Sequence, residues 1–539
     1  MMPNRMHALE STADRPATRG RIGLDVAVLA GALALFALLA LQMAPFVPDD
    51  SYISYRYAAN LAAGAGLRFN PGDAPVEGYS NFLWIVLLAL PARVGIDPVV
   101  AGPLLGGLFG GLTIVALWTL LRRLGRTGPD LFVPVGLLAV AAPLLLYTVS
   151  GMETPLFAFL LLTLMPAAER VWTRPSMANG AMLGAIGVLL ALARPEGIIA
   201  LPVVLVCLTL FASRAGRSAL WRATVVAALL FVVALVVYHV WRLSYFGAFW
   251  PTPFLSKGAS GDALFGSAVT NLRQFFVRQT HYYTPLAYYY GAIAIPAAVA
   301  AVMAWRRGEH RPIEWTALIL ALVFAVIYLN FVDWMPGMRY YAPLVGLLLI
   351  PFSLLGSQLF DAGARARGGL AYLLLGAVLA LFSLSSLAGL RLDSGRLQTS
   401  TAASMVELGH WLRGAMPGDA VLAMSDVGAT PYYSGLRTID INPESLTDRT
   451  IAEQGWSADY FFTVDPDVVV LTAFSLTRPD FYGAHEELYT MPRFQAAYER
   501  IGVVRNDWYQ DRAYWVFARR GQAPSAEQMA TFPAGIRKP

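Results

Sequence analysis

Long apolar segments, separated by short polar stretches, recur along the first 390 residues and set the class of the protein. The first runs from Val26 to Met43, and ten more follow at 99–121, 131–149, 154–168, 175–193, 197–213, 223–241, 285–305, 315–332, 340–357 and 368–390. A membrane-spanning helix needs about 20 predominantly apolar residues, and the first run is too long for the apolar part of a secretory signal. The pattern predicts a polytopic α-helical membrane protein with about eleven spans, the first of them retained.

Arginines alternate between the polar stretches, and this alternation predicts the orientation. If the N-terminal tail, residues 1–23, is cytoplasmic, every stretch on that side is basic, whereas the short outer turns carry only Arg194 and Arg339. Basic residues are expected to stay inside. The scheme requires Tyr79–Gly95 to lie on the membrane rather than cross it. Counting that segment as a further span is the alternative, and it would place the basic stretch 122–126 outside.

The pattern changes after Leu390. The remaining chain loses the long apolar runs and shows strand-like pieces between turns and helical stretches, namely AVLAMSD, RTIDIN, DVVVL and YWVFARR. We therefore expect a membrane domain at 24–390, with outer loops at 45–98 and 242–284, and a soluble α/β domain at 391–539. With about eleven spans, the second domain lies outside the membrane.

Composition agrees with this division and argues against several functions. Hydrophobic residues make up 57% of the chain and charged residues 14%, whereas soluble domains carry about 25% charged residues. The net charge of +5 is spread over dispersed arginines, without the basic block that favours nucleic acid, and the single cysteine excludes an intramolecular disulfide. No glycine-rich phosphate loop with a lysine is present in the sequence, which argues against a nucleotide donor or an ATP-driven pump.

Two adjacent aspartates, Asp49 and Asp50, stand between the first apolar run and a helical pattern at Ser51–Gly64. Tyrosines and alanines fall on one face of that pattern and polar side chains on another, which predicts an amphipathic helix on the outer membrane surface. Helix capping explains one carboxylate, because Asp is a favoured N-cap. It does not explain two beside an apolar wall, where like charges raise one pKa. A carboxylate in this place can deprotonate an alcohol as a general base.

The acidic pair opens a series of five short segments that resemble a known superfamily. They are DDSYISYRYAANLAAGAGLRFNPG at 49–72, SGMETPL at 150–156, ARPEG at 193–197, YFGAFWPTPFLSK at 245–257 and DWMPGMRYYAPL at 333–344. In this order they resemble landmarks of the GT-C superfamily of integral-membrane glycosyltransferases, and of the mycobacterial terminal arabinofuranosyltransferase family in particular. The resemblance covers most of residues 45–345. It implies a GT-C fold, with two outer surface helices before the second span.

The resemblance also implies a chemistry. The donor would be a polyprenyl-phosphate-linked sugar, and the acceptor a glycan, glycolipid or glycoprotein at the outer face of a bacterial cytoplasmic membrane. The base falls on Asp49, with Asp50 as a capping, metal or positioning partner. A departing phosphate needs positive charge nearby. Cations expected on the outer face are scarce, so the candidates for binding the donor phosphate are Lys257, Arg194 and Arg339.

Each of these cations has a simpler explanation. Lys257 can extend to a lipid phosphate, Arg194 can pair with Glu196, and Arg339 can pair with Asp333. Further candidates for substrate binding are Glu153, Glu196, Tyr55, Arg56, Glu77, Asp333 and His281. Glu153 is either a polar helix start or a second acid of the site. The aromatic segment 281–290 is alternatively a belt at the membrane interface.

These expectations combine into an inverting glycosyltransferase that moves a sugar to a cell-envelope glycan, with arabinofuranose or a related pentose indicated by the resemblance alone. Transfer of a hexose or aminosugar to lipid or protein is the alternative among enzymes. A lipid-linked sugar transporter and a non-catalytic assembly subunit are alternatives of other classes. Transport is disfavoured because the candidate charges gather near the outer surface and no inverted repeat is obvious. The cofactor stays open, since a divalent cation has oxygen ligands available but no dedicated loop.

Overall fold

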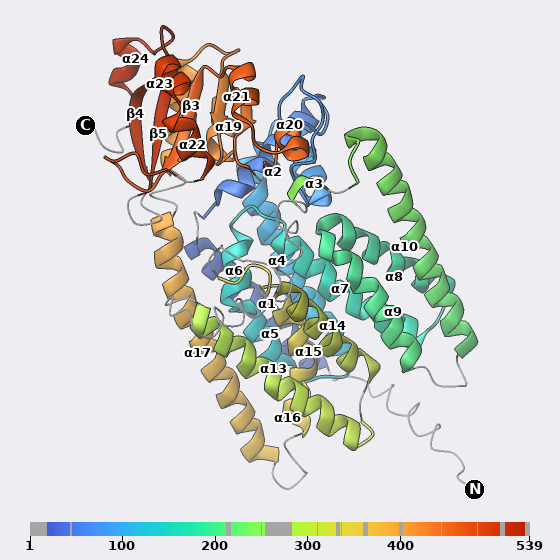
Figure 1. Ribbon diagram of the computed structural model, residues 1–539. Helices are drawn as coiled ribbons and strands as arrows, with labels where there is room; N and C mark the ends of the chain where they lie inside the picture. Colours follow the sequence, from blue (N-terminus) through green and yellow to red (C-terminus); the bar gives the residue numbers. More distant parts are fainter. Residues whose placement is uncertain are drawn as a thin grey trace, which may run out of the picture.

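The chain forms a helical bundle with a smaller α/β part at one end, as the computed structural model shows (Figure 1). The structure describes residues 19–43, 46–211, 217–249, 251–253, 283–309, 311–329, 335, 337–358, 365–397, 403–443, 445–481, 483–506 and 512–533. The helices of the bundle are α1 (Arg19–Met43), α2 (Asp49–Ala62), α3 (Phe82–Arg93), α4 (Pro98–Arg123), α5 (Pro129–Ala139), α6 (Ala142–Thr148), α7 (Thr154–Thr173), α8 (Met177–Ala193), the 3-10 turn η2 (Pro195–Ile199), α9 (Ala200–Leu210), α10 (Arg217–Phe246), α13 (Tyr283–Arg306), α14 (Pro312–Tyr328), α15 (Leu344–Phe352), α16 (Leu355–Gln358) and α17 (Arg365–Leu397).

Every apolar run predicted to span the membrane contains helix, but the count of eleven spans is not confirmed. Within the described ranges, six helices are long and apolar enough to cross a membrane, namely α1, α4, α7, α10, α13 and α17. The pair α5 and α6, bent by 48°, brings the number to as many as seven. Helices α8 and α14 are apolar but have 17 residues each. Length alone therefore does not assign them to spans, because an untilted crossing takes about 20 residues.

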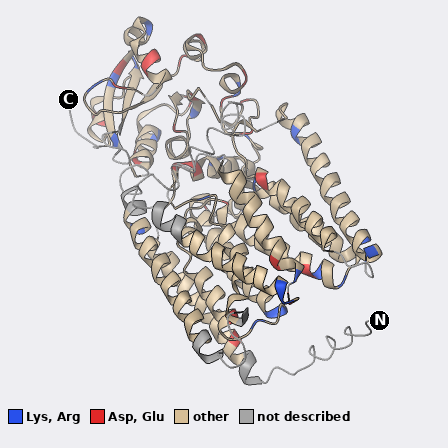
Figure 2. Cartoon of the chain, turned by 60° about the horizontal axis from the view of Figure 1, so that its bottom comes forward, with Lys and Arg blue, Asp and Glu red and all other residues tan. Residues whose placement is uncertain are grey.

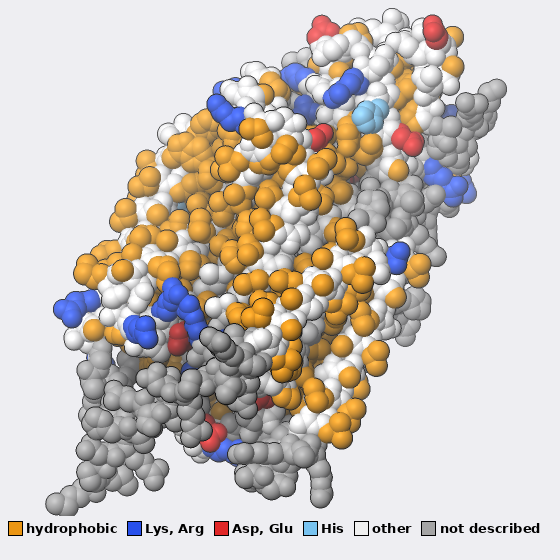
Figure 3. All heavy atoms as spheres, turned by 180° about the vertical axis from the view of Figure 1, so that it is seen from behind, with side chains coloured by type: hydrophobic (Ala, Val, Ile, Leu, Met, Phe, Trp, Pro, Cys, Tyr) orange, Lys and Arg blue, Asp and Glu red, His pale blue; other side chains and the backbone are white. Residues whose placement is uncertain are grey.

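The surface of the bundle has the character of a membrane protein. Figure 3 shows hydrophobic side chains over the middle of one face, with charged side chains toward its two ends. Helix α10 exposes a long apolar row that includes Val232, Val236 and Val240. Lys and Arg gather where helices end rather than along their lengths (Figure 2). One such terminal arginine, Arg126, pairs with the buried Glu314 at 2.6 Å and ties the start of α14 to the end of α4.

The C-terminal part is an α/β unit, as the sequence predicts. Its five-stranded sheet has the order β2-β1-β3-β5-β4, in which β2, β1 and β3 are parallel and β5 and β4 antiparallel. The strands are β1 (Val421–Met424), β2 (Arg437–Asp440), β3 (Val468–Ala473), β4 (Tyr498–Asn506) and β5 (Arg512–Arg519). The helices are α18 (Ala403–Ala415), α19 (Ala429–Ser434), α20 (Arg449–Gln454), α21 (Ala458–Val464), α22 (Ala484–Thr490), α23 (Pro492–Ala497) and α24 (Ala526–Ala530).

Strand β4 was not anticipated. Its sequence, YERIGVVRN, carries three charged residues, and its pairing with β5 is interrupted by a register shift between Arg500 and Gly502. An edge strand with polar side chains and a bulge does not show the regular alternation by which strands are recognised. The four predicted strand pieces coincide with β1, β2, β3 and β5. β3 is buried along its whole length, as expected of a central strand.

Helix α2 lies between the bundle and the α/β part, rather than on an open membrane surface (Figure 1). Eight consecutive residues, Ser51 to Ala58, are buried, including the charged Arg56. The sequence predicted an amphipathic helix on the outer membrane surface, and in the structure the α/β part covers this helix. α3 and α4 cover one side of α2, and α19 covers another. Of its polar side chains, Arg56 donates to carbonyl oxygens of the α/β part, whereas Ser54 bonds Asn81 and Asn60 bonds the carbonyl oxygens of Arg68 and Phe69.

Candidate functional site

The acidic pair begins helix α2, but it does not cap that helix in the predicted way. The N-cap is Pro48, and Asp49 and Asp50 occupy the first turn. Acidic side chains are favourable in a first turn because of the helix dipole. Ser51 follows directly, and its hydroxyl donates a hydrogen bond of 2.9 Å to the carbonyl oxygen of Ser150. The pair is thus fixed to the loop between α6 and α7.

Asp49 accepts two hydrogen bonds from the α/β part. The backbone N–H of Gly428 donates to Oδ2 at 3.0 Å, and that of Ala429 donates to Oδ1 at 2.6 Å. The carboxylate therefore sits at the start of α19, nearly 380 positions further along the chain. Burial raises the pKa of Asp49 well above its ordinary range, and Asp426 and Asp50 add to this, while the two N–H groups act against it. A raised pKa suits a carboxylate that has to take up a proton.

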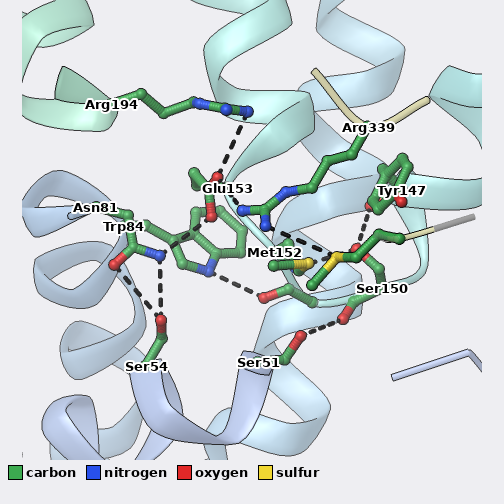
Figure 4. A network of polar contacts seen from close by, with 12 residues as sticks. Ser51, Ser54, Asn81, Trp84, Tyr147, Ser150, Met152, Glu153, Arg194 and Arg339 are labelled. Carbon is green, nitrogen blue, oxygen red and sulfur yellow. Dashed lines mark hydrogen bonds and ion pairs between the residues drawn. The ribbon is translucent and has the colours of Figure 1, made fainter. Parts of the chain in front are cut away.

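Glu153 forms the centre of a buried ionic cluster (Figure 4). Its Oε1 lies 2.6 Å from Nη2 of Arg339 and 3.7 Å from Nη1 of Arg194. Its Oε2 accepts a hydrogen bond of 3.1 Å from the Asn81 side chain. Burial alone raises the pKa of this carboxyl, but the two arginines outweigh that effect and lower it to about 2. Glu153 therefore stays ionised, and it serves as an anchor for two guanidinium groups rather than as a proton donor.

The two arginines have hydrogen-bonding capacity to spare. Arg194 also pairs with Glu196 at 2.7 Å, which is the pairing given from the sequence as the simpler alternative to phosphate binding. Yet Nη1 of Arg194 and Nε of Arg339 are both buried and lack a hydrogen-bond partner within the described part of the chain. Leaving a buried donor unsatisfied costs about 1–3 kcal/mol. The ring of Tyr340 lies 4.8 Å from one guanidinium and 5.8 Å from the other, so it holds both by cation–π contact.

Hydrogen bonds connect helix α2 to this cluster (Figure 4). The Asn81 side chain donates to Oγ of Ser54 at 3.0 Å and to Glu153, so it joins α2 to the anchor of the arginines. The indole N–H of Trp84 donates to the carbonyl oxygen of Gly151 at 2.9 Å and fixes the same loop from α3. Burial lowers the pKa of Arg339 and Glu153 raises it, and Asp50 also lies close enough to raise it, with a smaller effect. The acidic pair and the arginines thus belong to one site.

A group of tyrosines lies beside the acidic pair, between α2 and α19. Tyr52 contacts the rings of Tyr432 and Tyr433 at centroid distances of 5.8 and 5.6 Å. Tyr55 is buried, and its hydroxyl has no hydrogen-bond partner in the ranges that the structure covers. That hydroxyl faces Gly151, where an added Cβ would lie only 1.6 Å away and where φ is +72°. Glycine is required there on both counts.

Two of the predicted substrate-binding residues are engaged elsewhere. The Arg56 guanidinium donates to the carbonyl oxygens of Phe69 and Leu436 at 2.8 and 2.7 Å, and it also donates to Pro431. Its role is to fasten the α/β part to α2. Glu77 forms a buried ion pair with Arg242 of α10. Neither side chain joins the cluster around Glu153.

Three further predicted residues, Lys257, His281 and Asp333, lie outside the described residues. Arg339, for which pairing with Asp333 was the simpler explanation, is bound to Glu153. Of the aromatic segment 281–290, Tyr289 and Tyr290 are buried rather than exposed as in an interfacial belt. Burial between helices gives these two rings a packing role.

Some residues of the site were not expected from the sequence. Asn81 was passed over because a single amide side chain in a loop has no distinctive spacing. Gly428 and Ala429 contribute only backbone N–H groups, so no side chain marks them. The segment that contains them, SDVGATPYYSG at 425–435, does show a strand, a turn and a helix start. Among the described residues, no group of three or more His, Cys, Asp or Glu side chains is placed to hold a metal ion.

Comparison with known proteins identifies relatives for both parts of the chain. A family model described as "Domain of unknown function (DUF8728)" matches residues 393–518. The chain is 27% identical over 400 residues to the terminal beta-(1->2)-arabinofuranosyltransferase of Corynebacterium glutamicum, covering 66% of this chain and 55% of that protein. It is 30% identical over 232 residues to the protein of the same name from Mycobacterium tuberculosis, covering 40% of this chain and 36% of that one. The chain spans about half the length, or less, of these curated relatives.

Solved structures show the same fold at low sequence identity. ArnT from Cupriavidus metallidurans bound to undecaprenyl phosphate superposes with a TM-score of 0.58 at 16% identity, covering 94% of this chain and all of that one. The Archaeoglobus fulgidus oligosaccharyltransferase tethered with an acceptor peptide gives a TM-score of 0.52 at 15% identity, covering 83% of this chain and 69% of that one. The fold is therefore that of the GT-C superfamily, and the resemblance stated from the sequence is confirmed.

Proposed function

We propose that this protein is an inverting membrane glycosyltransferase. It transfers an arabinofuranosyl residue from a polyprenyl-phosphate donor to a cell-envelope glycan at the outer face of a bacterial cytoplasmic membrane. The observation that carries the proposal is the single connected site. It holds a partly buried carboxylate of raised pKa, Asp49, and two arginines, Arg194 and Arg339, each with one buried nitrogen that lacks a hydrogen-bond partner among the described residues. A base and a phosphate-binding group are the two functions that such a transfer needs.

In this mechanism Asp49 accepts the proton of an acceptor hydroxyl. The acceptor oxygen forms the new bond to the anomeric carbon as the bond from that carbon to the phosphate oxygen breaks. The bonding electron pair leaves with the polyprenyl phosphate, and the proton ends on Asp49. A single displacement inverts the anomeric carbon. The negative charge that Asp50 and Asp426 place near Asp49 increases its affinity for the proton.

The departing phosphate is bound by Arg194 and Arg339 in this proposal. Glu153 and Glu196 already balance the two positive charges. The arginines would therefore act mainly as preorganised hydrogen-bond donors through the nitrogens that lack partners among the described residues. Charge-assisted bonds of this kind are about twice as strong as neutral ones. Lys257 is the candidate for additional positive charge at the phosphate.

The donor and acceptor classes rest on similarity. Two curated relatives are named terminal beta-(1->2)-arabinofuranosyltransferases, and one solved structure of the same fold holds undecaprenyl phosphate. The outer location rests on the alternation of arginines along the chain, which favours a cytoplasmic N-terminus and an extracytoplasmic α/β domain. Membrane lipid surrounds the exposed apolar rows of the bundle. The base belongs to the first turn of α2, the helix that meets the α/β part (Figure 1).

The test is release of polyprenyl phosphate by the purified full chain from a panel of polyprenyl-phosphoryl sugars, with a glycan extract as acceptor. The panel contains arabinofuranose, a second pentose, a hexose and an aminosugar. We expect release with the arabinofuranosyl donor, its loss in Asp49→Asn, and wild-type release in Asp419→Asn, which changes an exposed aspartate of the α/β part. Release with only the hexose or aminosugar donor would assign the alternative transfer. No release from any donor by folded protein would overturn the proposal in favour of transport or assembly.

A further inference from the structure

The α/β part contacts the proposed base, Asp49, directly through the backbone of Gly428 and Ala429. We infer that the domain matched by the DUF8728 model is a working part of the catalytic site. Its backbone N–H groups at Gly428 and Ala429 position the Asp49 carboxylate, and its Asp426 sets the charge that the carboxylate faces. This inference rests on the proposed function, because it assumes that Asp49 takes the proton of the acceptor.

The two hydrogen bonds orient the Asp49 carboxylate and leave acceptor capacity on both of its oxygens. Oδ1 accepts from Ala429 and Oδ2 accepts from Gly428, so each oxygen receives one N–H group. A carboxylate has about four lone-pair sites on its two oxygens. Each oxygen of Asp49 therefore keeps a site for an acceptor hydroxyl, while rotation about the side-chain bonds is prevented. Reacting groups held in this way gain rate because their orientation is already fixed.

The fit between the two segments leaves no room for a side chain at position 428. A Cβ on Gly428 would lie 2.1 Å from the Asp49 carbonyl oxygen and 2.4 Å from both Cγ and Oδ1 of the carboxylate. Those distances are far below van der Waals contact, and two of the three concern the base itself. Glycine here is required by close approach rather than by backbone conformation. Any larger residue has to displace the loop, the carboxylate or both.

Contacts made by the residues that follow this loop keep it in register with α2. Arg56, two turns after Asp49, donates to the carbonyl oxygen of Leu436 at 2.7 Å and also to that of Pro431. Asn70 exchanges hydrogen bonds with the backbone of Thr438 at the start of β2, at 2.8 and 3.0 Å. All these contacts use backbone groups of the α/β part. The domain is thus fastened to α2 at several points, and Asp49 is one of them.

Asp426 stands in the same loop, two residues before Gly428. The Tyr514 hydroxyl of β5 donates a hydrogen bond of 2.7 Å to its Oδ2, which holds its carboxylate in place. Besides burial and the two N–H groups, the groups that act on Asp49 are Asp426 from the loop after β1 and Asp50 from α2. The two neighbouring carboxylates raise the pKa of Asp49, and the two N–H groups lower it less than burial and these charges raise it. The domain therefore supplies both the orientation and part of the basicity of Asp49.

If the contact between Gly428 and Asp49 only stabilised the fold, changing it would alter stability and leave kcat of the folded protein intact. If the contact positions the carboxylate, kcat falls in folded protein, and the experiment distinguishes these two outcomes. In the full chain, Gly428→Ala is compared with Gly418→Ala, a change in the same domain at a glycine with nothing within 4 Å of an added Cβ. We expect kcat of Gly428→Ala to fall on the order of 100-fold, the effect of about 1 Å of misplacement, with KM for the donor within about twofold of wild type. Gly418→Ala should retain wild-type values. Melting temperatures report whether each variant is folded.

A second variant keeps the test decisive if Gly428→Ala does not fold. Asp426→Asn removes one negative charge and preserves the shape of the side chain and its hydrogen bond from Tyr514. We expect the acid limb of the kcat/KM profile to move to lower pH, because the pKa of Asp49 falls when a neighbouring carboxylate is removed. A folded Gly428→Ala with wild-type kcat, or an acid limb that does not move in Asp426→Asn, would overturn the inference and leave the proposed function standing. Absence of transfer by the wild type from every donor would instead overturn the proposed function.

Discussion

Replacing Glu153 by glutamine tests the central ionic cluster most directly. The change keeps the size of the side chain and removes the charge that Arg339 and Arg194 share. Arg194 stays buried and keeps Glu196, whereas the largely buried Arg339 loses the carboxylate with which it pairs. Removing one member of a buried ion pair typically costs 3–5 kcal/mol, because the other charge is left uncompensated.

The structure gives an independent magnitude for the same loss. The surroundings lower the pKa of Glu153 from 4.5 to about 2, which corresponds to about 3 kcal/mol of preference for the ionised form at about 1.4 kcal/mol per pH unit. Glu153 is buried, so this figure needs no reduction for solvent screening. The two routes agree, and we expect Glu153→Gln to destabilise the folded protein by about 3 kcal/mol.

The assay is thermal unfolding of the full chain in detergent, with Glu453→Gln as the matched control. Glu453 pairs with Arg449 at 2.8 Å on an exposed helix, where such pairs contribute about 0.3–0.5 kcal/mol. We expect a fall of several degrees in the melting temperature for Glu153→Gln and a change within about 1 °C for Glu453→Gln. The difference should be constant between pH 6 and 8, since the contribution of Glu153 is present above pH 4.5 and is lost only as the pH falls through about 2.

A double-mutant cycle with Arg339→Met isolates the pair itself. Removal of both partners should cost less than the sum of the single changes, with a coupling of about 1–3 kcal/mol. Equal melting of Glu153→Gln and the control, or strictly additive effects in the cycle, would refute the view that Glu153 anchors the arginines.

Three further outcomes follow from the same geometry. Because the pKa of Asp49 is raised, transfer activity should be lost on acidification at a pH clearly above 3.9, the ordinary pKa of aspartate. A kcat/KM profile with its acid midpoint at or below 3.9 would contradict the assignment of Asp49 as the base. Gly151→Ala should destabilise the protein by several kcal/mol, because backbone strain is joined by a clash with the Tyr55 hydroxyl. Gly128→Ala, also at positive φ but in open space, should cost about 1–3 kcal/mol from backbone strain alone, and chemical unfolding measures both. Burial raises the pKa of Asp440 to about 7. The contribution of Asp440 to the stability of the fold should therefore be complete below pH 3.8 and be lost as the pH rises through 7. The melting temperature of Asp440→Asn should lack this dependence on pH.

The sequence predicted the class of the fold because apolar periodicity and arginine alternation act over whole segments. Each long apolar run is helical, and the strand-like pieces after Leu390 form the parallel core and one antiparallel strand of the sheet. The boundaries of the helices and the number of membrane spans were harder to predict from the sequence. A run of 17 apolar residues, such as α8, reads the same whether it crosses the membrane or packs within the bundle.

The site was only partly predictable, since its connections depend on tertiary contacts. The sequence places the polar residues of α2 on one face of an amphipathic helix, and no local pattern shows that the α/β part covers that helix. The partners of Asp49 are backbone N–H groups, for which the sequence carries no signal beyond a glycine. The sequence left Glu153 as either a polar helix start or a second acid of the site, and its role as an ionic anchor depends on Arg339, which lies 186 residues further along the chain.

The contact between Asp49 and Gly428 also bears on the order in which the protein is made. The two residues are 379 positions apart, so at about 5–20 residues per second the carboxylate leaves the ribosome roughly 20 to 75 seconds before the loop that orients it. During that interval the first helix and its acidic pair are already inserted, and the later helices are still being added one after another. A chain that stalls anywhere before position 428 therefore has an unoriented base.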